Sequence, residues 1–126
     1  MSKPASKKWL SQAKQDLDWT RANLREKIWY GACFTAQQAA EKSLKAYLIS
    51  KGKSIFKTHD LGALVTISKK YDPEFEQIKE DCAILTNYYS PARYPDTAEF
   101  MIFSKSKAEE ALRLAREVFE FVERRI

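Results

Sequence analysis

The feature that most limits the fold is a repeat of small and apolar side chains between residues 33 and 48. Its members are Cys33, Ala36, Gln37, Ala40, Leu44 and Leu48. Spacings of three and four residues place such side chains on one face of an α-helix. The alanines leave room for a neighbouring helix to approach closely. The repeat therefore predicts a packed helix that ends near Ser50, followed by Gly52, a residue typical of helix C-termini.

Comparable spacings predict helices in the rest of the chain. The expected helices span about residues 6–25, 33–50, 58–70, 73–89 and 106–122, with a break at Tyr30-Gly31. The expected N-caps are Ser6, either Thr58 or Asp60, Asp72, and either Ser104 or Ser106. Only 3 Gly and 4 Pro are present, and clusters of β-branched residues are scarce, which argues against a sheet. The sequence predicts an all-α, up-and-down antiparallel bundle of four long helices plus one short helix.

Length and composition favour a single domain over residues 1–126, because 126 residues with 44% apolar side chains suffice for one core. No apolar run approaches the ~20 residues that span a bilayer, and no signal peptide is visible, so we expect a cytoplasmic protein without membrane contact. Cys33 and Cys82 are isolated in apolar stretches, which predicts buried thiols. Residues 1–60 hold 12 Lys and Arg against 5 Asp and Glu, so this half suits a polyanionic partner.

The segment from residue 90 to 96 cannot stay helical, because Pro91 and Pro95 each remove a hydrogen-bond donor. These prolines and Asp96 are expected to shape a loop. Arg93 lies between the prolines and could bind a phosphate with its guanidinium group, or could pair with Asp96 or Glu99 to hold the loop. Tyr94 could stack on a base, although aromatic residues near a helix end more often belong to a core.

Three further polar residues are candidates for a nucleotide or RNA site. His59 is the only histidine of the chain and could act on a ligand or simply hydrogen-bond the neighbouring turn. Lys42 and Lys45 lie near one another on the predicted second helix and could neutralise phosphates, or could only solvate an outer face. No Gly-rich phosphate loop, paired histidine ligands or Ser/His/Asp set is present, so we expect no cofactor and no metal.

Three blocks in order resemble the HEPN domain family: residues 33–46 (CFTAQQAAEKSLKA), 58–61 (THDL) and 92–96 (ARYPD). The resemblance extends over nearly the whole chain. It implies a helical bundle that often dimerises, is commonly encoded beside a minimal nucleotidyltransferase in toxin–antitoxin modules, and in many members is a metal-independent ribonuclease. It also implies roles in nucleotide binding for Arg93, Tyr94 and His59.

The ribonuclease motif of that family is incomplete in this chain. In ribonuclease members four to six residues separate an arginine from a histidine, whereas Arg93 is followed at those positions by Ala98, Glu99 and Phe100. The expected function is therefore binding of a nucleotide or RNA beside a nucleotidyltransferase partner. There are two alternatives. One is a metal-independent ribonuclease toxin that uses Arg93 with His59, and the other is a protein-interaction scaffold. Whether the protein is an enzyme therefore stays open.

A homodimer is expected under each of these functions. Trp9, Trp19 and Trp29 lie in or beside the first predicted helix and would form an apolar face that a second copy covers, although tryptophans can equally belong to the core.

Overall fold

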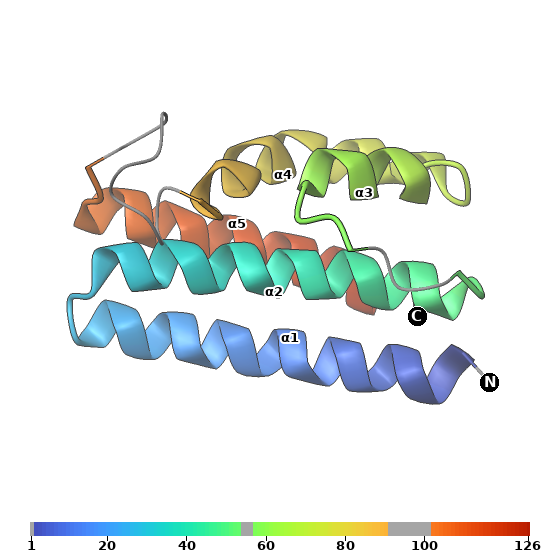
Figure 1. Cartoon of the computed structure of the whole chain (residues 1–126), viewed down its shortest axis with the longest axis horizontal. Helices are drawn as coiled ribbons and strands as arrows, with labels where there is room; N and C mark the ends of the chain where they lie inside the picture. Colours follow the sequence, from blue (N-terminus) through green and yellow to red (C-terminus); the bar gives the residue numbers. More distant parts are fainter. Residues whose placement is uncertain (1, 54–56, 91–101) are drawn as a thin grey trace.

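The computed structural model describes residues 2–53, 57–90 and 102–126, which form an all-helical bundle without strands in these ranges (Figure 1). Side chains are described from Pro4 onward. The elements are α1 (Ser2–Arg25), α2 (Trp29–Ser50), α3 (Leu61–Ser68), the 3₁₀ helix η1 (Pro73–Ile78), α4 (Lys79–Leu85), the 3₁₀ helix η2 (Thr86–Tyr88) and α5 (Lys105–Glu123). The predicted helical bundle is confirmed.

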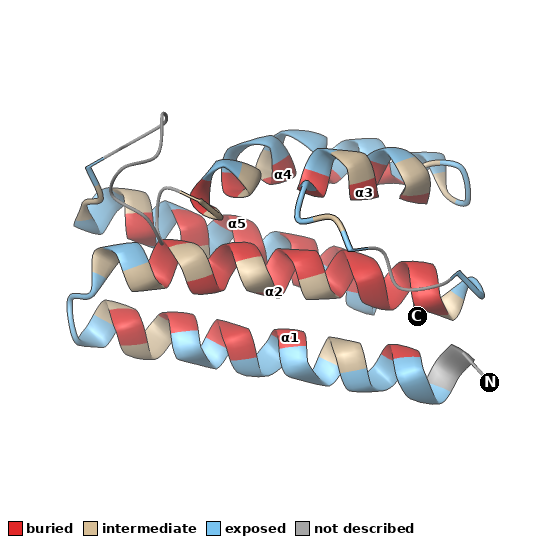
Figure 2. Ribbon diagram, in the orientation of Figure 1, coloured by how far each residue is buried: buried red, intermediate tan, exposed pale blue. Residues whose placement is uncertain are grey.

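Helix α2 lies at the centre of the bundle. It runs antiparallel to α1 on one side and packs against α5 and the α3–α4 layer on the others (Figure 1). Most of its length is buried, as Figure 2 shows. Ala36, Ala40 and Leu44 are fully buried, which confirms the face predicted from the repeat. Burial of such a continuous apolar face is the main source of stability in a domain of this size.

The predicted fourth long helix is divided into η1, α4 and η2. Its buried side chains are Phe75, Ile78, Cys82, Leu85 and Tyr88. Three of the four intervals between these positions are of three residues, and a 3₁₀ helix aligns residues i and i+3 on one face. Short 3₁₀ turns at both ends of α4 therefore keep these side chains directed at the core. Within the described ranges the bundle therefore consists of three long helices (α1, α2 and α5), the short helix α3 and one segmented helix.

The expected start of the first helix is wrong. Ser6 lies inside α1 rather than at its N-cap, and its buried hydroxyl donates to the Ala46 carbonyl of α2 at 2.9 Å. The break between α1 and α2 falls before Tyr30-Gly31, at residues 26–28, where Lys27 has a φ of 60°. Gly31 lies within α2, and a Cβ there would come within 2.7 Å of Asn23 Oδ1 in α1. The glycine thus permits close approach of the two helices.

The other helix ends follow the sequence signals closely. Asp60 caps α3 by accepting from the amides of Gly62 and Ala63, and Asp72 caps η1 by accepting from the amide of Glu74. Ser104 rather than Ser106 caps α5. Gly52 follows α2 with a φ of 84°, the left-handed conformation that glycine adopts without strain.

Both cysteines are free and fully buried, as predicted. Burial raises the pKa of Cys33 to about 12 and also raises the pKa of Cys82, so both remain neutral thiols at physiological pH. Across the three described ranges, no helix has the length and hydropathy needed to cross a membrane. The same ranges contain no group of three or more His, Cys, Asp or Glu residues that could bind a metal ion.

Candidate functional site

A buried ion pair on α2 forms the base of the candidate site. Lys45 Nζ lies 2.8 Å from Glu41 Oε2, and both residues are only 5% exposed. They are four residues apart and so share one face of the helix. Removing two charges from water is expensive, and the cost is offset only when both groups are well hydrogen-bonded.

The amide of Gln37 supplies a second donor to the same carboxylate. Gln37 is fully buried, and its Nε2 donates to Glu41 Oε1 at 3.1 Å and to the His59 carbonyl at 3.4 Å. Gln38 Nε2 in turn donates to Gln37 Oε1 at 2.8 Å. The two glutamines therefore form a chain of hydrogen bonds that ends at Glu41.

His59 connects this buried network to the surface. Its Nδ1 lies 3.1 Å from each oxygen of Glu41, and its ring stacks on Tyr89 with centroids 4.1 Å apart and an interplanar angle of 14°. The His59 side chain is 46% exposed, whereas that of Glu41 is 7% exposed. Glu41 thus holds one edge of the imidazole and Tyr89 holds one face, while the side chain stays accessible to solvent.

The backbone around His59 is fixed by its neighbours. Asp60 caps α3 immediately after the histidine, and the Leu61 amide donates to Thr86 Oγ1 of η2 at 3.0 Å. This hydrogen bond joins the start of α3 to the segment that carries Tyr89. We refer to Gln37, Glu41, Lys45, His59 and Tyr89 as the His59 site.

The His59 site has the chemical means to bind a polar aromatic ligand. The stacked imidazole and phenol offer aromatic surface, and the imidazole has a second nitrogen, Nε2, on the edge away from Glu41. A carboxylate at one nitrogen of a histidine is also the arrangement by which many enzymes orient a general base.

The structure separates the two predicted lysines. Lys45 belongs to the His59 site, whereas Lys42 Nζ faces α1 and lies 2.9 Å from Asp16 Oδ2. Burial raises the pKa of Asp16, and the hydrogen bond and charge of Lys42 act in the opposite direction. The ammonium groups of both lysines therefore have carboxylate partners within the protein.

The predicted loop residues lie outside the described residues, namely Pro91, Arg93, Tyr94, Pro95 and Asp96. Tyr89 of the His59 site precedes Arg93 by four residues, and an extended chain of that length reaches about 14 Å at most.

Sequence reasoning did not identify Gln37, Glu41 or Tyr89 as site residues. Gln37, Glu41 and Lys45 recur at four-residue spacing on a helix whose buried face is otherwise mostly apolar, and that polar stripe was the available signal. Spacing from Leu85 predicts that either Tyr88 or Tyr89 lies on the buried face of its helix; the structure buries Tyr88 and places Tyr89 at intermediate burial against His59.

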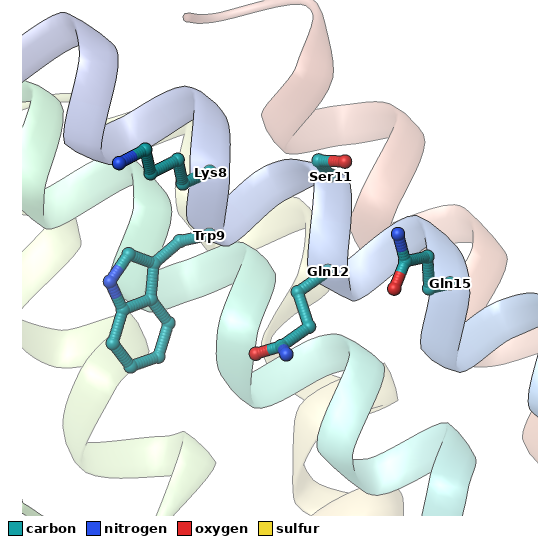
Figure 3. A pocket seen from close by; sticks show the side chains of 5 residues that line it. All are labelled: Lys8, Trp9, Ser11, Gln12 and Gln15. Carbon is teal, nitrogen blue, oxygen red and sulfur yellow. The ribbon is translucent and has the colours of Figure 1, made fainter.

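Two surface hollows lie apart from the His59 site. One of about 470 Å³ follows α1 and is lined by Lys8, Trp9, Ser11, Gln12 and Gln15, whose side chains project to different sides of the helix (Figure 3). The other, of about 210 Å³, lies between η1, α4 and α5 and includes Asp81 and Glu117. Neither includes a residue of the His59 site.

Comparison with known proteins identifies the class to which this helical bundle belongs. The sequence model of the HEPN domain matches residues 6–125, and the chain therefore belongs to the HEPN family. The crystal structure of TT1696 from Thermus thermophilus is 33% identical, with a TM-score of 0.82 over 96% of this chain and 98% of that one. The archaeal HEPN homologue ST0689 is 27% identical, with a TM-score of 0.77 over 95% and 96%. No curated protein matches the chain.

Proposed function

We propose that this HEPN protein binds a nucleotide, or a nucleotide unit of RNA, at the His59 site together with Arg93 and Tyr94. The observation that supports the proposal most directly is the stacked pair of His59 and Tyr89 above a buried charge network. Stacking on aromatic side chains is the usual way in which proteins hold unpaired bases.

The neighbouring loop residues complete this proposed site. Arg93 can bind a phosphate with two hydrogen bonds, and Tyr94 can extend the aromatic surface. Both are within chain reach of Tyr89, so one ligand can contact all three. Lys42 and Lys45 are left out of the proposed ligand contacts, because each is paired with a carboxylate of the protein.

We further propose that the protein works beside a minimal nucleotidyltransferase in a toxin–antitoxin type module and forms a homodimer. Family membership is the basis for the first part. The exposure of two large aromatic side chains near the α1–α2 turn supports the second, because Trp19 is 54% and Tyr30 is 57% exposed. Both proposals can be tested by co-purification and by light scattering.

The decisive experiment is a binding titration with ATP, GTP and a labelled single-stranded RNA in the presence of EDTA. Arg93→Ala and Tyr89→Leu are expected to weaken binding by about tenfold or more, since each removes a charge-assisted hydrogen bond or a stacking surface. Arg116→Ala is the matched control, because Arg116 is an exposed arginine of α5. Equal losses in Arg93→Ala and Arg116→Ala would point to nonspecific charge attraction and refute the proposed site.

The contact between Glu41 and His59 also favours a second candidate function, a metal-independent ribonuclease. A histidine oriented by a carboxylate could remove a proton from a ribose hydroxyl while Arg93 stabilises charge on the phosphate. The same RNA samples distinguish the two functions. Cleavage in EDTA that disappears in His59→Ala favours the ribonuclease, and binding without cleavage excludes it.

A further inference from the structure

The hydrogen bonds around Glu41 determine which nitrogen of His59 carries hydrogen. The ammonium of Lys45 and the amide NH₂ of Gln37 can only donate, and Glu41 accepts from both at 2.8 and 3.1 Å. Both Glu41 oxygens are also 3.1 Å from His59 Nδ1. A carboxylate has no hydrogen to give, so Nδ1 must be the donor in that contact.

We propose that Glu41 is a positioning residue that fixes His59 in the tautomer with hydrogen on Nδ1 and leaves Nε2 as the hydrogen-bond acceptor offered to the ligand. The ligand part of this inference rests on the proposed function of the His59 site. Neutral Nε2 then selects a ligand group that donates a hydrogen bond, such as a ribose hydroxyl or an N–H of a base, in preference to an unprotonated phosphate oxygen.

The surroundings of Glu41 support this role. Gln38 donates to Gln37 Oε1, so the NH₂ of Gln37 must face Glu41. Lys45 already balances the charge of the carboxylate, so the contact with His59 does not require a protonated imidazole. With Glu41 itself 5% exposed, water cannot readily replace these partners.

The ring of His59 has one productive orientation. Stacking on Tyr89 fixes the plane of the imidazole, and the contact with Glu41 fixes which edge points inward. Rotation of the ring by 180° would move Nδ1 away from the carboxylate and leave a buried charge with one donor fewer. Nε2 therefore lies on the edge directed away from Glu41, in a side chain that is 46% exposed.

The tautomer can be measured on the protein without any ligand. His59 is the only histidine of the chain, so every imidazole signal in the spectrum belongs to it. Nitrogen-15 chemical shifts of tag-free, histidine-labelled protein at neutral pH distinguish the two tautomers. We expect hydrogen on Nδ1 in the wild type. Free neutral imidazole side chains prefer hydrogen on Nε2, so loss of Glu41 should move the population toward that form.

Two variants make this spectroscopic test robust. Glu41→Gln removes the obligate acceptor but leaves Lys45 buried without a partner, which can prevent folding. Glu41→Leu/Lys45→Met removes both charges together with every side-chain hydrogen-bond acceptor at position 41. Circular dichroism verifies folding of each. Hydrogen on Nε2 in the wild type, or an unchanged Nδ1 tautomer in the folded double variant, would overturn the role of Glu41.

The ligand part is tested with His59→Asn and ATP. An asparagine side chain can place its amide nitrogen near the position of Nδ1 and keep the donation to Glu41, but it has no atom at Nε2. We expect a melting temperature close to wild type and an affinity for ATP lower by at least about three- to tenfold, the value of one hydrogen bond, because the variant loses Nε2 and the face of the imidazole ring. Unchanged affinity in this variant would overturn acceptance by Nε2.

The binding titration and the tautomer spectrum test the proposed function and the role of Glu41 independently. If the wild type binds neither ATP nor labelled RNA, the proposed function fails and the ligand part of the inference fails with it, while the tautomer spectrum still decides the role of Glu41. If ATP binds and the spectrum shows hydrogen on Nε2, the proposed function stands and the role of Glu41 is refuted.

Discussion

The contact between Asp81 of α4 and Glu117 of α5 makes a definite prediction about stability and pH. Burial, followed by the hydrogen-bond contact and charge of Glu117, raises the pKa of Asp81 from 3.8 to about 6. Arg113, whose guanidinium lies 3.3 Å from the Glu117 carboxylate, opposes the shift only in part. Two carboxyl groups in contact favour a state in which they share one proton.

The sign of the effect follows from the protons bound by each state. Between about pH 4 and 6 the folded protein holds more protons at Asp81 than the unfolded chain, so stability falls as pH rises through that window and stays low above it. Two pKa units correspond to about 3 kcal/mol at most. Asp81 is only partly buried, and solvent screening reduces this to about 1 kcal/mol.

Asp81→Asn should remove this penalty, because an amide can donate to Glu117 and carries no charge. We expect the variant to be more stable than wild type by about 1 kcal/mol near pH 8, a rise of about 3–5 °C in melting temperature, and equally stable near pH 4. Thermal unfolding followed by circular dichroism across that range measures both. Glu80→Gln, which removes a neighbouring charge with a smaller effect on Asp81, is the matched control. A gain independent of pH, or an equal gain in the control, would refute the argument.

Three substitutions test contacts that hold the bundle together, each by urea denaturation. Arg125→Ala should lower the urea midpoint, because Arg125 Nε donates to Asp72 Oδ2 at 2.9 Å and ties the C-terminus to η1; no change would mean that the pair is solvated. Gly31→Ala should cost about 1 kcal/mol despite better helix propensity, since its Cβ would crowd Asn23; stabilisation would show that Asn23 moves freely. Asp60→Ala should cost about 1 kcal/mol through loss of the α3 cap, and an unchanged midpoint would contradict that role.

The sequence was sufficient for the bundle and for most helix ends, because both depend on local signals. The repeat that begins at Cys33 predicted the buried face of α2, and Asp60 and Gly52 marked helix boundaries through capping and backbone conformation. The start of α1 was misplaced because a serine in a polar stretch looks like a cap. Its actual partner, the Ala46 carbonyl, is 40 residues away and invisible to local pattern.

The His59 site was predicted only in part, because its defining contacts are not local. His59 stood out as the one histidine, but Glu41, 18 residues earlier, has the sequence appearance of an ordinary solvated helix residue. Lys45 was considered for phosphate binding because lysines are usually exposed, whereas the fold buries it beside Glu41. Arg93 and Tyr94 lie outside the described residues and stay predictions.

The residues of the His59 site come from two different parts of the bundle. Glu41 and Lys45 belong to α2, the most buried helix, while His59 and Tyr89 belong to short segments that flank α3 and η2. The hydrogen bond from the Leu61 amide to Thr86 couples those two segments to each other. A ligand that stacked on the aromatic pair, as proposed above, would contact both of these segments, whereas the carboxylate that orients His59 belongs to the buried helix. Any displacement of the 57–61 segment would change the distance between Nδ1 and Glu41, and with it the hydrogen bonding of Nε2.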